Sequence, residues 1–148
     1  MLTLNGKRSL MIITDENYFD HDADIGIIGR GHSLEESFVD AATAMFALMA
    51  NLSEVHPKTS IKFEFEETDV ELAFVTWLNS LIAKAQADNL LLSRFQIKKN
   101  GNLWHGEAQG EVWRDDIERG IEVKGATLTM LSVKQAEGKW EAKCVVDV

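Results

Sequence analysis

The dipeptide Asn100-Gly101 divides the last third of the chain into two segments that read as strands. Asn-Gly between two such segments is the strongest short hairpin signal, because both residues accept positive φ angles. It predicts an antiparallel pair formed by residues 91–98 and 103–112. A second pair is predicted from residues 123–134 and 140–148, with a turn at 136–138. The charged residues 113–120 are expected to form a loop between strands.

Two helices are predicted upstream of this sheet. Ser33 and Glu36 have the spacing of a capping box, and apolar residues recur at helical spacing as far as Leu52. Thr68 opens a second capping box, and the helix behind it runs to Ala87 and is apolar nearly all round, as buried helices are. The remaining strands are expected at residues 9–14, 25–28 and 61–66, the second of them ended by Gly29-Arg30-Gly31.

These elements predict one α+β domain over residues 1–148, a two-layer domain with two helices packed on a largely antiparallel β-sheet. A chain of 148 residues, 45% of them hydrophobic, can bury a real core. Residues 1–17 form an N-terminal extension to which the sequence assigns no role. No signal peptide and no apolar run of about 20 residues is present, and the one cysteine, Cys144, excludes an internal disulfide. A reducing cytoplasm is therefore the expected location.

A cluster of acids precedes the first predicted helix. Asp20, Asp22 and Asp24 lie within five residues, with His21 among them. Their spacing opens like a calcium loop, but the glycine that should follow the third Asp comes one residue late and the twelfth position lacks its Glu. Two carboxylates held within 4 Å repel by about 4 kcal/mol at an effective dielectric of about 20. The stretch is therefore either a cation site or a solvated acidic turn.

A second source of carboxylates lies at the other end of the chain. Asp147 is followed by Val148, which is expected to carry the free α-carboxylate. Hard divalent ions prefer such oxygen donors. If the last strand lies near Asp24, three carboxylates meet; the alternative is a terminal strand with a solvated aspartate.

Other chemistry has weaker support in the sequence. The four histidines lack the spacing of a zinc site, and no Ser or Cys nucleophile has an evident base. Gly29-Arg30-Gly31 lacks the downstream residues of a P-loop. Cys144 is interpreted as a small core residue and the four tryptophans as packing residues.

Four motifs, taken in order, resemble the archease family. They are Asp20-His21-Asp22-Ala23-Asp24-Ile25-Gly26 followed by Ser33-Leu34-Glu35-Glu36-Ser37-Phe38; Gly110-Glu111; Glu122-Val123-Lys124-Gly125-Ala126-Thr127; and Val145-Val146-Asp147-Val148. The chain departs from the family pattern at Asp22, where the family has Thr, and at Leu128 and Thr129, which replace an aromatic residue and a histidine. A histidine often found before the third motif is absent, with residues 115–119 in its place.

The resemblance implies a compact α+β accessory protein for the GTP-dependent tRNA-splicing RNA ligase. Such a protein promotes guanylylation of the ligase histidine and multiple turnover in tRNA splicing and RNA repair. The implied metal ligands are Asp24, Asp147 and the terminal carboxylate of Val148, for calcium, magnesium or manganese, whereas GTP is used by the ligase.

The leading hypothesis is thus a metal-binding ligase activator that is not an enzyme. The formal charge of −9 disfavours a direct grip on nucleic acid or contact with an anionic membrane, and it suits a basic cleft on the partner. The alternatives are a small metal-dependent phosphohydrolase and a chaperone-like protein-binding module. The oligomeric state stays open.

Overall fold

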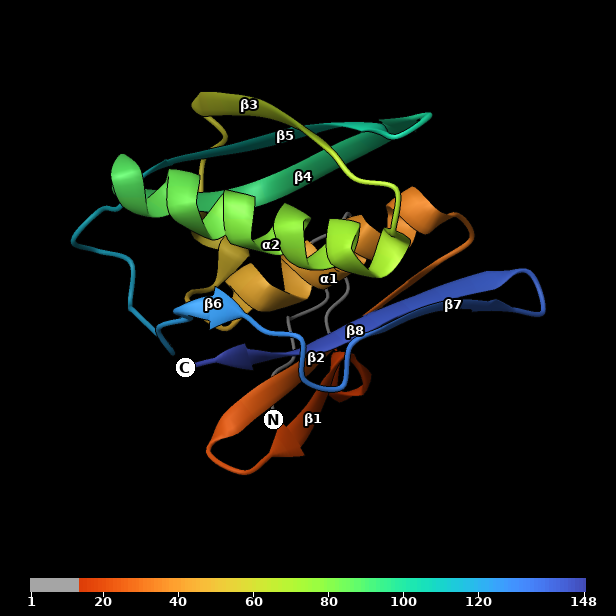
Figure 1. Ribbon diagram of the computed structural model, residues 1–148. Coiled ribbons are helices and arrows are strands. Elements are labelled where there is room, and N and C mark those ends of the chain that lie inside the picture. Colours follow the sequence, from red (N-terminus) through yellow and green to blue (C-terminus); the bar gives the residue numbers. More distant parts are fainter. Residues whose placement is uncertain (1–13) are drawn as a thin grey trace.

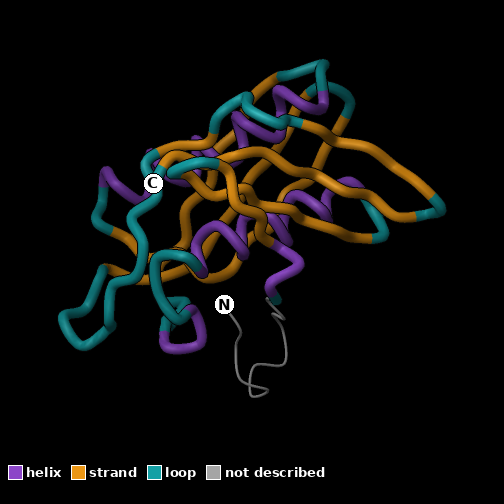
Figure 2. Tube along the Cα trace, turned by 90° about the horizontal axis from the view of Figure 1, so that it is seen from below, coloured by secondary structure: helices purple, strands orange, loops and turns teal. Residues whose placement is uncertain are grey.

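The structure, a computed structural model, describes residues 14–148. A layer of two helices lies between two antiparallel β-sheets (Figure 1), and the view from below shows strands of the lower sheet crossing the helices (Figure 2). The helices are α1 (Leu34–Ala47) and α2 (Val70–Ala87), with short 3-10 helices η1 (Asp15–Asn17) and η2 (Leu52–Glu54). The predicted α+β class with antiparallel strands is confirmed.

The strands are shared between two sheets, here called sheet A and sheet B. Sheet A has the order β1-β2-β8-β6, with β7 also paired to β8. Its strands are β1 (Tyr18–His21), β2 (Asp24–Gly31), β6 (Gly125–Ala126), β7 (Ser132–Ala136) and β8 (Lys139–Asp147). Sheet B has the order β3-β5-β4 and consists of β3 (Thr59–Glu66), β4 (Leu90–Asn100) and β5 (Leu103–Val112).

The helices are therefore covered on two sides rather than packed on one sheet. Helix α2 contacts β3 and β4 of sheet B and β6, β7 and β8 of sheet A. This position explains why apolar residues occupy most of its circumference, since both sides of the helix are removed from water.

Both predicted hairpin turns are present. In the β4–β5 hairpin Asn100 pairs with Leu103, so the loop residues are Gly101 and Asn102, one position later than an Asn-Gly turn would place them. Gly101 has a φ of 65°, at the position where a type II′ turn requires glycine. In the β7–β8 hairpin, Glu137 and Gly138 both have positive φ angles.

The expected break of the second strand at Gly29-Arg30-Gly31 is wrong. Strand β2 continues to Gly31 and remains paired with β8 throughout. Helix α1 packs directly on the strand there: a Cβ on Gly29 would lie 2.1 Å from the carbonyl oxygen of Ser37 and 2.4 Å from the nitrogen of Ala41. The glycine marks a close approach of helix and strand backbones, not a turn.

The helix starts agree with the capping signals, with one shift. Ser33 caps α1, its Oγ accepting from the backbone N–H of Glu36 at 3.0 Å. Helix α2 is capped by Asp69 rather than Thr68, because the Asp69 carboxylate accepts from two backbone N–H groups of the first turn at 2.8 and 3.2 Å.

Within residues 14–148, no helix is long and apolar enough to cross a membrane.

Helix α1 ends at Ala47, five residues before the predicted end at Leu52. The chain leaves the helix because the loop over residues 113–124 supplies partners for the carbonyl groups that follow. The carbonyl oxygens of Leu48 and Met49 accept from N–H groups of that loop at 2.8 and 2.7 Å. Non-local bonds thus satisfy the carbonyls that a helix leaves without intrahelical partners.

The start of the described chain belongs to the fold, although the sequence analysis assigned it no role. The predicted strand 9–14 lies outside the described residues except for Thr14, which caps η1. Asn17 is buried, and its Nδ2 donates to the carbonyl of Ile28 at 2.8 Å and to Asp40 Oδ2 at 3.1 Å. The next residues form β1, an unpredicted strand that pairs with β2.

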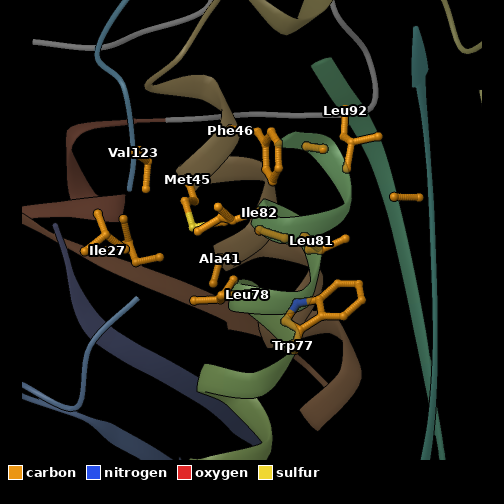
Figure 3. Packing of buried hydrophobic residues seen from close by; sticks show 14 of the residues in the cluster. Ile27, Ala41, Met45, Phe46, Trp77, Leu78, Leu81, Ile82, Leu92 and Val123 are labelled. Carbon is orange, nitrogen blue, oxygen red and sulfur yellow. The ribbon is translucent and has the colours of Figure 1, made fainter. Parts of the chain in front are cut away.

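The interpretation of Trp77, Trp104 and Cys144 as core residues is confirmed, since all three are fully buried. Each indole N–H donates to a backbone carbonyl, at 2.9 Å from Trp77 and 3.0 Å from Trp104. Figure 3 shows the Trp77 indole among apolar side chains of the core. Burial raises the pKa of the Cys144 thiol to about 12, so the thiol is uncharged at neutral pH.

Candidate functional site

The acidic stretch forms the tight turn between β1 and β2. His21 pairs with Asp24, which leaves Asp22 and Ala23 as the two loop residues. Asp22 has a φ of 52°, and its side chain is 93% exposed. A short polar side chain tolerates this left-handed backbone. Asp22 therefore makes the turn, and Asp24 becomes the first residue of β2.

The pairing of β2 with β8 brings the two ends of the chain together. Ile25 pairs with Val146, so extending the register by one step places Asp24 opposite Asp147. The backbone N–H of Val148 donates to Asp24 Oδ1 at 3.2 Å. Figure 1 shows the β1–β2 turn and the C-terminal end of β8 on the same side of the molecule. The structure thus brings together all three residues that the sequence analysis selected.

Asp24 and Asp147, here called the acidic pair, lie on the outer face of sheet A. Residues that are directly opposite in an antiparallel pair point to the same face. The register therefore places the side chains of His21, Asp24 and Asp147 in one row across β1, β2 and β8. Asp20 pairs with Ile25 and belongs to the opposite face. The sequence analysis noted His21 among the acids, but only the strand register places it in this row.

An aromatic ring covers the glycine next to this row. A Cβ on Gly26 would lie 2.1 Å from the nearest ring atom of Phe19, so the ring lies across the glycine. Lys143 of β8 places its Nζ 6.0 Å from the centre of the same ring. The Asp24-Ile25-Gly26 motif therefore combines an acid at the strand end with a glycine that leaves room for Phe19.

Strand β6 supports Asp147 from the other side. The backbone N–H of Lys124 donates to the carbonyl of Asp147 at 2.8 Å. The Asn79 side chain of α2 holds the neighbouring residue twice, donating to the Ala126 carbonyl at 3.1 Å and accepting from its N–H at 2.8 Å. The Val-Lys-Gly-Ala-Thr motif is thus a short strand fixed between β8 and α2.

The strand predicted over residues 123–134 is wrong in its middle. A loop over residues 127–131 separates β6 from β7. Thr127 Oγ1 donates to the carbonyl of Val145 at 2.8 Å, and the N–H of Val145 donates to the carbonyl of Thr129 at 3.0 Å. The tip exposes Leu128 and Met130, which are 62% and 50% exposed.

The donor set can be compared with the divalent ion that the family resemblance implies. Asp24 and Asp147 offer carboxylate oxygens, and the expected α-carboxylate of Val148 would add a third group; such oxygen ligands suit calcium, magnesium or manganese. Within residues 14–148, no three side chains of His, Cys, Asp or Glu are grouped as a metal site. An ion held there would have two side-chain ligands and keep several waters, as Mg²⁺ commonly does. The residues present fit such an ion.

A buried acid in sheet B has a structural role instead. Glu111 of β5 is 4% exposed and accepts from the backbone N–H of His56 at 2.7 Å and from Arg114 Nη1. Lys58 Nζ lies 3.9 Å from its other oxygen. The hydrogen bond from His56, together with these cations, holds the pKa of Glu111 below its ordinary value. The Gly-Glu motif therefore ties β5 to the loop before β3.

A cavity of about 460 Å³ lies at the C-terminal ends of the helices. Phe46, Ile82 and Leu90 form part of its apolar wall, and the Arg119 guanidinium lies 3.9 Å from the centre of the Trp113 ring at its rim. None of the residues of the acidic pair lines it. The cavity and the acidic pair are separate features.

Known relatives share most of this chain. Protein archease of Sulfolobus acidocaldarius is 34% identical over 139 residues, which cover 92% of this chain and all of the relative. Protein archease of Methanothermobacter thermautotrophicus is 32% identical and covers 88% of this chain and 96% of its own length.

Solved structures share the fold. The solution structure of Methanobacterium thermoautotrophicum protein 1598 matches with a TM-score of 0.80 and 32% identity, over 89% of this chain and 97% of that one. The crystal structure of a Thermotoga maritima archease, described as a "possible chaperone", matches with a TM-score of 0.63 at 21% identity, over 88% of this chain and 94% of that one. The model of the Archease protein family (MTH1598/TM1083) matches residues 17–148. The chain therefore belongs to the archease family.

Proposed function

We propose that this chain is a metal-binding accessory protein that activates the GTP-dependent tRNA-splicing RNA ligase. In this role it promotes guanylylation of the ligase histidine and repeated turnover during tRNA splicing and RNA repair, without being the catalyst itself. The observation that supports the proposal is the meeting of Asp24 with Asp147 and Val148 at one end of sheet A.

The charge of the protein favours a basic partner. Its formal charge is −9, and the acidic pair lies on a solvent-facing end of the sheet. A ligase that binds GTP and RNA needs a cationic cleft, and complementary charge speeds and orients docking. The same charge disfavours a direct grip on RNA by this protein.

The residues have distinct parts in this proposal. Asp24 and Asp147 hold the ion, and the hydrogen bond from Val148 fixes the Asp24 carboxylate beside the last strand. A bound divalent ion would supply positive charge that can neutralise phosphate oxygens of the nucleotide. Lys124 and Asn79 keep the β8 end in place.

The test is guanylylation of the partner ligase, measured as labelled GMP attached per minute. Wild type should accelerate the reaction, and Asp24→Asn and Asp147→Asn should each remove most of the acceleration. Asp20→Asn is the matched control, because it removes one acid from the same hairpin on the opposite face. Full activity in both site variants would exclude this site assignment.

A second candidate is a chaperone-like binding module, which the exposed Leu128 and Met130 favour. It predicts that suppression of client aggregation survives Asp24→Asn and Asp147→Asn and is weakened by Leu128→Ser. Hydrolysis of nucleotides by the purified protein alone, lost in Asp24→Asn, would instead favour a metal-dependent phosphohydrolase.

A further inference from the structure

The edges of the two sheets differ in how well they are protected against pairing with a further strand. In sheet A, β1 spans four residues, and the opposite edge is interrupted by residues 127–131. In sheet B, β4 carries a register shift between Leu92 and Arg94. Strand β3 pairs with β5 over the eight residues Thr59–Glu66 without a shift, and no other strand in the described part of the chain pairs with it. A long, regular edge is a template for another strand.

The hydrogen-bonding pattern shows which residues face this edge. The N–H of Glu67 donates to the carbonyl of Asn102 at 2.9 Å, one step beyond the β3–β5 register. Because bonded pairs alternate along an antiparallel ladder, the odd-numbered residues of β3 bond to β5. The even-numbered residues direct their N–H and C=O groups to the free edge. They are Ser60, Lys62, Glu64 and Glu66, all with exposed side chains.

The sequence of this edge is complementary to itself. When two copies of β3 pair antiparallel about a two-fold axis, even residues must face even residues. Centred on Phe63, the pairing puts Lys62 of each copy opposite Glu64 of the other. Centring on Lys62 or on Glu64 instead places like charges face to face at the axis. Opposite charges at facing positions stabilise a strand pair and like charges destabilise it, so the register centred on Phe63 is favoured over these two.

The side chains of β3 that face α2 are compatible with the same pairing. Phe63 is half-buried, and its ring lies 5.8 Å from that of Trp77, which places α2 beneath β3. In the centred register Phe63 faces Phe63 of the second copy in a non-hydrogen-bonded pair, where side chains approach closely. The centred register thus pairs apolar side chains on the face turned to α2.

We propose that β3 pairs with β3 of a second copy of this chain, in the register centred on Phe63. The pairing joins the two B sheets into one continuous antiparallel sheet. The acidic pair lies in sheet A, across the helical layer from this edge, and stays accessible in both copies. The inference does not depend on the proposed ligase function.

The test is sedimentation velocity over a range of concentrations. Wild type should show a monomer–dimer equilibrium, and Lys62→Glu and Glu64→Lys should each raise the dimer dissociation constant at least about tenfold, because two like-charge pairs replace two opposite ones. An equimolar mixture of the two variants should form a heterodimer. The double variant Lys62→Glu/Glu64→Lys restores complementarity and should dimerise as wild type does.

The control is Lys98→Glu, an exposed charge on β4 at the other edge of sheet B, which should leave the equilibrium unchanged. Circular dichroism checks that each variant is folded. A wild type that stays monomeric up to its solubility limit would overturn the proposal, and so would single variants that dimerise like wild type. If this edge instead pairs with a strand of another protein, the wild type should be monomeric on its own, which also overturns the proposal. Lys62→Glu should still activate the ligase, so failure of the dimer proposal can be distinguished from failure of the proposed function.

Discussion

The backbone N–H of Val148 donates to the carboxylate of Asp24 at 3.2 Å, across 124 positions of sequence. The bond joins the β1–β2 turn to the end of β8, where Asp147 lies on the same face of the sheet. An aspartate that accepts a main-chain hydrogen bond has one oxygen fixed in direction. The other oxygen can then meet a ligand without a search through rotamers.

Replacing either aspartate should weaken cation binding more than it weakens the fold. Asn at position 24 can still accept the Val148 hydrogen bond but has no charge, so Asp24→Asn tests the charge alone. We expect Mn²⁺ affinity, measured by isothermal titration calorimetry, to fall at least about tenfold in Asp24→Asn and in Asp147→Asn. Asp20→Asn should bind as wild type does. Equal affinity in all four proteins would contradict the site.

The contribution of Val148 can be tested by appending one glycine after it. The extension turns the Val148 carboxylate into a peptide group, while the Val148 N–H can still reach Asp24. If the carboxylate is a ligand, Mn²⁺ affinity should fall while the midpoint of urea unfolding without metal stays close to that of wild type. An unchanged affinity would reduce the site to the two aspartates.

Two glycines of β2 should respond differently to alanine. A Cβ at Gly26 meets the end of the Phe19 ring, a half-buried side chain that can turn away, whereas one at Gly29 meets the backbone of α1. We expect Gly26→Ala to cost about 1 kcal/mol of unfolding free energy and Gly29→Ala about 3 kcal/mol or more. Urea unfolding measures both, and similar costs would show that Phe19 is not held over Gly26.

Glu111 should make stability depend on pH in the acid range. Its folded-state pKa is lowered, so its stabilisation is fully present above the unfolded-state pKa of about 4.3 and is lost as pH falls through the lower folded value. Glu111→Gln should therefore unfold at lower urea than wild type at pH 7, and the difference should shrink below pH 4. A difference that stays constant down to pH 3 would show that the charge is unimportant.

Asn79 should matter to both the fold and the site. Asn79→Ala leaves the N–H and carbonyl of Ala126 without their side-chain partner, which should cost about 1–3 kcal/mol. Because β6 also holds the Asp147 backbone, Mn²⁺ affinity should fall as well. Gln96→Ala, on the exposed face of β4, is the control and should change neither quantity. Lost stability with unchanged affinity would separate β6 from the site.

The sequence predicted what depends on local patterns. The Ser33 cap, the β4–β5 hairpin and the buried character of α2 follow from neighbouring residues, and all are present. The predictions failed where contacts between residues far apart in the sequence determine the structure. Helix α1 stops early because the 113–124 loop bonds the carbonyls of the two residues that follow it, and β2 continues through Gly29 because α1 lies against it. The meeting of Asp24 and Asp147 came from the family resemblance, since no local pattern encodes a register between residues so far apart.

The distance along the chain between β2 and β8 has a kinetic consequence. The β4–β5 hairpin closes a two-residue loop, whereas Ile25 must find Val146 across most of the chain. Contacts of such separation form slowly, so we expect the pairing of β2 with β8 to be a late step of folding. A cation that binds only the finished acidic pair then stabilises the native state by mass action and slows the reopening of that last pairing. A bound metal ion would therefore stabilise only the assembled sheet, and partly folded chains would lack the site altogether.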